Sequence, residues 1–217
     1  MNNFLDIETI PDQSENALER IAETIKHPAQ MKVPATIEKW EKEKKPEAIE
    51  KAWRDTSFDG GFGEVISVSF AIADCEIESF YRGLDEPESD LLSNAFEAIR
   101  NANPRVKPFF IGHNIPFDLR FLFRRAVVLG INPGFDLPFA GRHGQQFFDN
   151  AVAWCGYKDY IKQDTLCKVL GIKGKPDDID GSKVWDFVKA GKVERVAEYN
   201  RDDVDKVRQI YNKLNYA

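Results

Sequence analysis

The sequence predicts one domain with a mixed α/β fold, a central sheet flanked by helices. Strand-like apolar segments come first, a helix–strand–helix stretch follows, and the last part of the chain has helical spacing. The length of 217 residues suits a single domain over 1–217 with one elaboration. A hydrophobic fraction of 42% with 16 Phe and 4 Trp can fill a sizeable core.

Residues 3–8 are expected to form the first strand, which ends where Pro11 and Asp12 interrupt the apolar pattern. The stretch over about 12–58 differs in composition. Its segments are rich in Lys and Glu, and "SENALERIAETIKH" has apolar residues at helical spacing. Pro46 stands where a proline can begin a helix. These features predict a helical insertion after the first strand.

Residues 64–73, "EVISVSFAIA", are typical of a strand, and "EIESFYRGL" is expected to be its hairpin partner. Strict alternation along this strand would place Val65 on the same face as Ser67 and Ser69.

The segment "SDLLSNAFEAIRN" has the spacing of an amphipathic helix. A short apolar strand at 108–111 then leads through a turn into a helix from Pro116 to Leu129. The segment "QQFFDN" predicts one more short strand. The remaining chain is expected to be helical, with the last helix over about 192–214.

The formal net charge of −6 argues against a general binder of polyanions, because non-specific affinity for nucleic acid comes mostly from Lys and Arg at phosphates. A local basic groove is compatible with this total. The three cysteines show no paired or zinc-ligand spacing, and the chain has neither 18 consecutive apolar residues nor a charged leader. We therefore expect a cytoplasmic protein with reduced thiols and no membrane segment.

Two carboxylates stand close together at the start of the chain. Asp6 and Glu8 are two residues apart on a strand, so both project from one face while Leu5 and Ile7 point to the other. Neighbouring carboxylates repel, and each resists ionising beside the other. A divalent metal such as Mg²⁺ or Mn²⁺ would relieve this repulsion, because these ions prefer oxygen ligands. The alternative is an edge strand whose acidic side chains face solvent.

Two further acidic groups follow. In "GHNIPFDLRFL", Pro116 sets the first helical turn, so Asp118 lies near a helix N-terminus, where a negative charge is favourable. The turn before this helix follows a strand, and sites in α/β sheets collect at the carboxyl ends of strands. In "EYNRDDVDKVRQIY", Tyr199 and Asp203 are four apart and share one face of a helix. Alone, each group also has an ordinary structural explanation.

Taken in this order, "FLDIETIP", "GHNIPFDLRFL" and "YNRDDVDKVRQIY" resemble the three motifs of the DEDD superfamily of 3′-5′ exonucleases, in the subclass with a tyrosine in the third motif. The chain is most similar to stand-alone exonucleases related to the proofreading domain of family-B DNA polymerases, and 169–204 resembles their C-terminal half. The resemblance covers 3–11 and about 61–214, and it leaves out the helical insertion.

The resemblance implies a ribonuclease-H-like (DnaQ-like) fold. It also implies hydrolysis of DNA from the 3′ end by a two-metal mechanism that releases nucleoside 5′-monophosphates. Four carboxylates would hold two divalent ions, Mg²⁺ or Mn²⁺: Asp6, Glu8, Asp118 and Asp203. Tyr199 would orient the attacking water.

Asn114 and Phe117 match the second motif, and we expect them to steady the terminal nucleotide and to form the wall of the site. Five basic residues are further candidates for contacts with the phosphates of the substrate strand: Arg120, Arg124, Arg125, Lys173 and Lys175. A solvated polar surface is the alternative for all five.

His113 is interpreted as a spacer in its motif rather than as a general base. Asp149 is expected either to cap a helix or to support the site with a further carboxylate. Glu198 occupies the position at which the histidine subclass carries its base, which favours the tyrosine subclass. Trp40 and Trp53 are expected to be packing anchors rather than platforms for stacked bases.

The sequence thus predicts a metal-dependent 3′-5′ exodeoxyribonuclease acting on a single-stranded DNA 3′ end. An RNA 3′-processing exonuclease is the alternative within the same chemistry, and a catalytically silent nucleic-acid-binding module is the alternative without it. The presence of all four carboxylates and Tyr199 argues against the silent module, which would need none of them. A replication or recombination protein is a candidate partner, and no membrane is expected.

Overall fold

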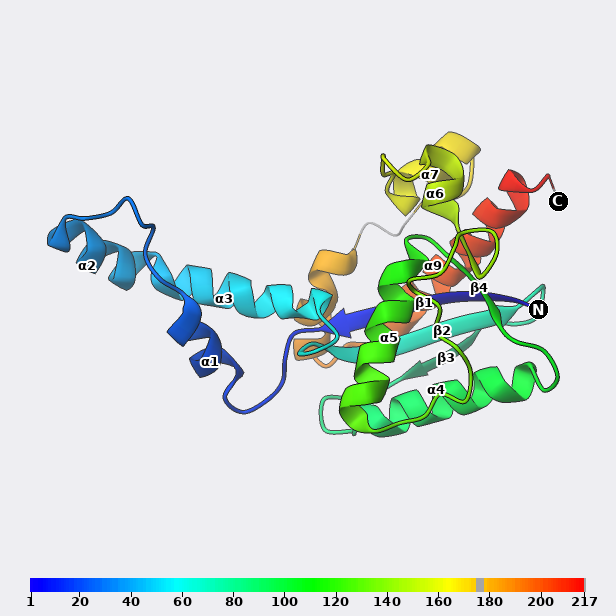
Figure 1. Cartoon of the computed structure of the whole chain (residues 1–217), viewed down its shortest axis with the longest axis horizontal. Coiled ribbons are helices and arrows are strands. Elements are labelled where there is room, and N and C mark those ends of the chain that lie inside the picture. The colour runs from blue at the N-terminus through cyan, green and yellow to red at the C-terminus, as the bar shows by residue number, and fades with distance from the viewer. Residues whose placement is uncertain (175–177, 217) are drawn as a thin grey trace.

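A five-stranded sheet runs through the centre of this computed structural model, which describes residues 1–174 and 178–216 (Figure 1). Its strands are β1 (Asn2–Ile10), β2 (Glu64–Ile72), β3 (Glu78–Tyr81), β4 (Phe109–Gly112) and β5 (Phe147–Asp149). They lie in the order β3-β2-β1-β4-β5. β2 is antiparallel to β1 and β3, whereas β4 is parallel to β1 and β5. The expected mixed sheet and the hairpin are confirmed.

Helices cover both faces of the sheet. The α-helices are α1 (Ala17–Thr24), α2 (Pro34–Glu43), α3 (Lys45–Asp55), α4 (Glu88–Ala102), α5 (Ile115–Leu129), α6 (Asn150–Cys155), α7 (Gln163–Leu170), α8 (Val184–Lys189) and α9 (Val193–Leu214). Two 3₁₀ turns, η1 (Thr56–Phe58) and η2 (Gly181–Lys183), precede β2 and α8. Among the described helices, none is long and apolar enough to cross a membrane.

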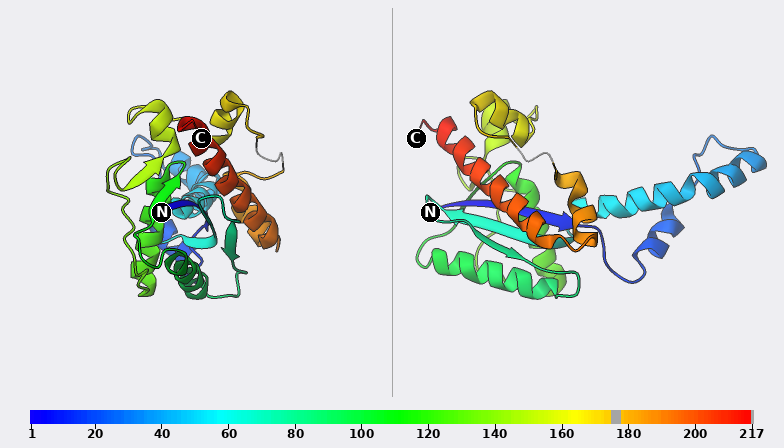
Figure 2. Two further views of the ribbon diagram at one scale, coloured as in Figure 1. Left: turned by 90° about the vertical axis from the view of Figure 1, so that its right-hand side faces the viewer. Right: turned by 180° about the vertical axis from the view of Figure 1, so that it is seen from behind.

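The two faces of β1 belong to different parts of the core. Leu5 and Ile7 pack with apolar residues of α4 and α5, which cover one face of the sheet. Phe4 and Ile10 lie on the opposite face, where they pack among residues that include those of α9. The view from behind in Figure 2 shows α9 crossing the sheet on this second face. Asp6 and Glu8 alternate with Leu5 and Ile7, so they face α9 rather than the α4–α5 layer.

A bulge changes the faces expected for β2. Its pairing with β1 shifts between Glu8, which lies opposite Ser67, and Thr9, which lies opposite Val65. Ile66 is thus the extra residue, and the side chains before and after it no longer alternate strictly. Val65 packs with the α4–α5 layer, so the prediction that it shares a face with Ser67 is wrong.

The segment between β1 and β2 forms an arm that extends away from the sheet at the carboxyl end of β1 (Figure 1). Helices α2 and α3 contain no buried residue in the described structure. The root of α3 is anchored by Trp53, whose ring lies 5.3 Å from that of Trp185 on α8 and whose indole N–H donates to the Asp12 carbonyl over 2.8 Å. Trp53 therefore packs as expected, and Trp40 contacts His27.

Gly63 allows η1 to lie directly on the end of β1. A Cβ added to this glycine would lie 2.4 Å from the carbonyl oxygen of Thr56 and 3.0 Å from that of Ile10. Both neighbours are backbone atoms, so a side chain here would have to push the two segments apart. The turn between the arm and β2 thus requires a glycine at this position.

We predict that Gly63→Ala lowers the free energy of unfolding by about 1–3 kcal/mol, because the added methyl group overpacks two backbone segments. Urea denaturation measures this change. Gly181→Ala is the matched control, because a Cβ added there meets no atom within 4 Å. Equal stability of the two variants would contradict the packing argument.

Candidate active site

Asp118 is held at the open part of β1, beyond the end of β4. The two strands pair only from Asn2 to Phe4 of β1, whereas β1 continues to Ile10. In this extension the N–H of Ile7 donates to Oδ1 of Asp118 over 3.2 Å. Asp118 comes from the first turn of α5, as the sequence predicted. The parallel strands thus bring the first and second motifs together at their carboxyl ends.

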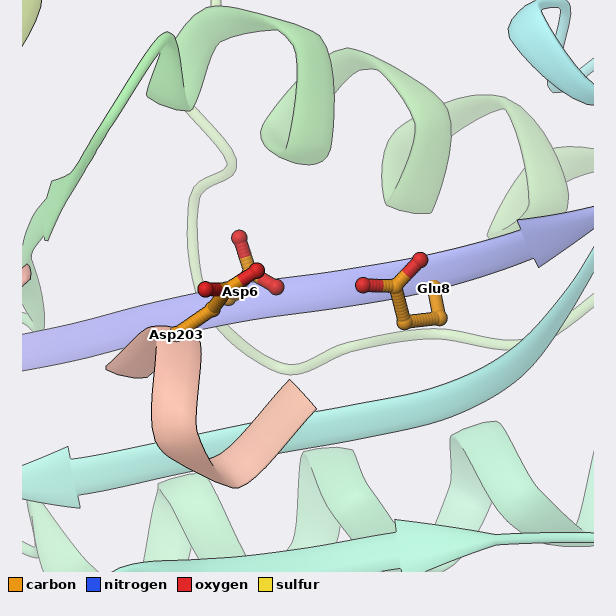
Figure 3. Close-up of side chains that lie close together, drawn as sticks. All are labelled: Asp6, Glu8 and Asp203. Atoms are coloured by element: carbon orange, nitrogen blue, oxygen red, sulfur yellow. The ribbon is translucent and has the colours of Figure 1, made fainter. Parts of the chain in front are cut away.

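Three carboxylates converge above β1. One oxygen each from Asp6, Glu8 and Asp203 lies within 4.8 Å of the other two. Figure 3 shows the first two on β1 and the third on α9 beside them. Asp203 is 3% exposed, and Glu8 is also buried. Solvent therefore screens the repulsion among these charges only weakly.

Asp118 experiences the same crowding. Burial raises the pKa of its carboxyl well above the ordinary value, and the charge of Asp6 raises it further, while the hydrogen bond from Ile7 acts in the opposite direction. Carboxylate oxygens are the ligands that hard divalent cations prefer. The donor set formed by these acidic side chains therefore fits Mg²⁺ or Mn²⁺.

Tyr199 lies one helical turn before Asp203 on α9, and its ring is 2% exposed. Burial raises the pKa of its phenol far above the ordinary value, and the carboxylate of Asp203, to which it hydrogen-bonds, raises it further. The charges of Glu8 and Asp6 act in the same direction. The phenol therefore stays protonated. Glu198, by contrast, is exposed and pairs with Arg195 over 3.5 Å.

Asn200 is a site residue that the sequence reasoning missed. Its side-chain amide donates to Oδ2 of Asp6 over 2.7 Å, and its carbonyl oxygen accepts from the hydroxyl of Ser67 over 2.9 Å. It is completely buried. Asn200 therefore connects α9 to β2 and fixes the orientation of the Asp6 carboxylate. Its place directly after Tyr199 in the third motif was the available signal.

Lys206 is a second residue that was missed. Its ammonium is buried, forms an ion pair with Asp202, and lies 3.8 Å from Oδ1 of Asp203. This positive charge offsets part of the repulsion around Asp203. The backbone of Asp203 is held as well, because Gln163 of α7 donates to its carbonyl oxygen over 3.0 Å.

The turn of the second motif is tied to the neighbouring strand. Asn114 adopts a left-handed conformation with φ 63°, and its N–H donates to Oδ1 of Asp149 over 3.0 Å. The same oxygen accepts from Ala151, so Asp149 also caps α6. His113 Nε2 lies 2.7 Å from the Ile161 carbonyl. His113 and Asp149 thus both hold the turn in place.

A cleft of about 870 Å³ contains the site. Its lining includes the five residues assigned to catalysis: Asp6, Glu8, Asp118, Tyr199 and Asp203. Asn114 and Phe117, which were expected to contact a nucleotide, also line it. Two exposed aromatic residues, Phe58 of η1 and Tyr160, stand on its walls.

Most of the basic candidates are engaged elsewhere. Arg125 is buried and forms a bidentate ion pair with Glu88, so the prediction that it contacts phosphate is wrong. Arg124 donates to Asp59 over 2.6 Å. Arg120 is exposed, but neither it nor Arg124 lines the cleft.

Two lysines were the other basic candidates. Lys173 is exposed and is not among the residues that line the cleft. Lys175 lies outside the described residues.

Comparisons with known proteins identify a family and a similar fold. Residues 60–216 match the model of a family described as "predicted 3′-5′ exonuclease related to the exonuclease domain of PolB". The structure is similar to the family B DNA polymerase from the hyperthermophilic archaeon Pyrobaculum calidifontis, with a TM-score of 0.61 and 17% sequence identity. The match covers 99% of this chain and 24% of the polymerase chain, so this chain spans about a quarter of its length. Among curated proteins, none matches the chain.

These findings confirm two expectations from the sequence. The family match confirms the resemblance to exonucleases related to the family-B polymerase domain. The structural match, at 17% identity, bears on the fold alone, and with the mixed sheet and its helices it confirms the ribonuclease-H-like architecture.

We predict that Asp6→Asn melts at least as high as the unmodified protein in chelator, because it removes one of the repelling charges. Lowering the pH should shrink the difference. The raised pKa of Asp118 means that its ionised form costs stability, and this cost is full above the folded-state pKa. The cost declines as the pH falls through the folded-state pKa and is absent below the unfolded-state pKa. Thermal melting across pH measures both effects.

Asp74→Asn is the matched control for the Asp6 substitution, because it removes one charge from an exposed turn. An Asp6→Asn variant that melts well below this control in chelator would contradict the repulsion argument.

We also predict that Asn200→Ala lowers the free energy of unfolding by about 1–3 kcal/mol, because the buried hydroxyl of Ser67 and carboxylate of Asp6 both lose a partner. Asn212→Ala on the same helix is the control, since its side chain makes no hydrogen bond in the described structure. Chemical denaturation of both variants measures the difference, and equal stabilities would refute the assigned role.

Proposed function

Because the chain belongs to the family of 3′-5′ exonucleases related to the exonuclease domain of PolB, we propose that it hydrolyses single-stranded DNA from the 3′ end with divalent metal ions. The products are nucleoside 5′-monophosphates. The observation that carries this proposal is the convergence of three carboxylates, Asp6, Glu8 and Asp203, in a cleft that Asp118 and Tyr199 also line.

The acidic side chains would hold two divalent ions, Mg²⁺ or Mn²⁺. Ions held there would supply Lewis-acid activation of the attacking water and stabilisation of the leaving oxygen. Asp6 and Glu8 offer ligands from the rigid strand, and Asp203 offers one from α9 on the same side. Asp118, tied to the backbone of β1, offers a ligand from the neighbouring edge.

Tyr199 positions the attacking water. Its phenol stays protonated because burial and the surrounding carboxylates raise its pKa, so the hydroxyl keeps a proton to donate. The hydroxyl donates this proton to Asp203, and its oxygen can accept from a water molecule in the cleft that the ring lines. Asn114 and Phe117 face the terminal nucleotide in the same cleft.

Digestion of 5′-labelled single-stranded DNA tests the proposal. In Mg²⁺ or Mn²⁺, the label should remain on strands that shorten stepwise from the 3′ end, and chelator should stop the reaction. Asp203→Asn should abolish shortening. Asp205→Asn should retain it, because Asp205 lies outside the cleft and pairs with Arg208 on the same helix.

RNA of the same sequence is the second arm of this experiment. Faster shortening of RNA than of DNA would replace the proposed substrate by the alternative one. Binding without shortening of either strand, at any metal concentration, would refute the exonuclease and favour the silent module.

We predict that Tyr199→Phe lowers the cleavage rate by a factor within or below the range of about 10²–10⁴ that is typical of a positioned proton-handling group. In the unmodified protein, the raised pKa of the phenol predicts a pH–rate profile without a limb from tyrosine ionisation up to strongly alkaline pH. Single-turnover rates across pH measure this profile. Tyr157→Phe, at an exposed tyrosine, is the control. A limb that disappears only in Tyr199→Phe would show that the phenol ionises and contradict the assigned role.

A further inference from the structure

A second pocket, of about 450 Å³, lies at the root of the arm and borders the cleft. Five residues line both spaces: Thr9, Ser57, Phe58, Gly181 and Ser182. The remaining wall of this arm-root pocket is formed by α3 together with Pro11 and Trp185. Because Thr9 follows Glu8 on β1, the pocket lies next to the acidic site.

Hydrogen bonds fix the walls of the arm-root pocket in place. The hydroxyl of Thr9 donates to the carbonyl oxygen of Ser57 over 2.7 Å, which ties η1 to β1. On the other side, Arg54 of α3 bonds Asp186 of α8 over 3.0 Å. A ligand would therefore meet a preformed pocket and would lose little free energy in ordering it.

Phe58 presents an aromatic ring where the two spaces meet. Phe58 comes directly after Ser57, whose carbonyl oxygen is hydrogen-bonded to Thr9. Its side chain lines both the cleft and the arm-root pocket and is 67% exposed. The residue stands before the segment 60–216 that matches the family model. It lies in η1, where the arm returns to the sheet.

The charges around the site favour binding of a nucleic acid through its bases rather than through its phosphates. The chain is acidic overall, and the cleft holds clustered carboxylates that repel phosphates. Two basic residues line the arm-root pocket, Lys51 and Arg54, and Arg54 is engaged with Glu50 and Asp186. Three acidic residues line the same pocket: Glu47, Glu50 and Asp55. Stacking on an aromatic ring depends on the face of a base and not on its charge, so it supplies affinity that this charge distribution does not.

We propose that the arm-root pocket binds an unpaired nucleobase of the DNA strand whose 3′ end lies in the cleft, with Phe58 as the stacking surface. This inference rests on the proposed function, because the strand must thread through the cleft to reach the pocket. The two spaces share five lining residues, and this adjacency favours a base of the same strand over a separate ligand.

Binding of single-stranded oligonucleotides with one abasic position tests the inference. The abasic position is moved through the last nucleotides before the 3′ end, and affinities are measured by fluorescence anisotropy in Ca²⁺. For the unmodified protein, one abasic position should weaken binding about 5- to 100-fold, the range for the loss of one stacked base. Phe58→Ala should weaken binding of the intact strand by a similar factor.

The decisive result is the coupling between the two changes. The affinity of Phe58→Ala should not change further when the same position is made abasic, because the stacking interaction between ring and base is already lost in this variant. Phe58→Trp should restore both the affinity and the sensitivity. Phe123→Ala is the control, because Phe123 is 44% exposed but lines neither space.

Additive effects of the two changes at every position would overturn the inference, and a side chain of a protein partner would become the better occupant. Because affinity is measured without turnover, this outcome is distinct from failure of the proposed function. A protein that binds with the expected coupling and yet never shortens DNA would refute the exonuclease alone.

Discussion

The mutual repulsion of the carboxylates at β1 is the constraint on which the rest of the structure depends. Asp6 and Glu8 face α9 because β1 alternates, and Asp203 and Asp118 arrive from helices on two sides. The like charges stay together because hydrogen bonds hold the elements that carry them. The bond between Asp118 and Ile7 joins α5 to the strand, and Asn200 joins α9 to it. Such a cost in stability is expected where function requires the charges.

The same constraint shapes how a nucleic acid can bind. Phosphates meet an acidic cleft, and the nearby arginines Arg124 and Arg125 are already paired with carboxylates. Divalent ions would reverse the local charge at the reacting phosphate only. Lys162 is the basic side chain on the cleft wall, so contacts with bases are expected to supply much of the affinity for the remaining strand, and the aromatic rings on the walls are suited to them.

Local periodicity was sufficient to predict the parts of the site that lie within one element. The period of two on β1 predicted the shared face of Asp6 and Glu8, and the spacing of four on α9 predicted that of Tyr199 and Asp203. Pairing between distant segments was not predictable in this way. The partner of Arg125 is 37 residues away in sequence, and no local pattern indicates it. The bulge in β2 likewise arises from its pairing with β1 and not from its own sequence.

Calorimetric titration of the protein with Mn²⁺ measures the metal site without a substrate. We expect two ions bound per chain and a loss of at least one of them in Asp203→Ala, while Tyr199→Phe retains both, since the protonated phenol is no ligand. Retention of both ions by Asp203→Ala, together with their loss in Tyr199→Phe, would contradict the assignment of these roles.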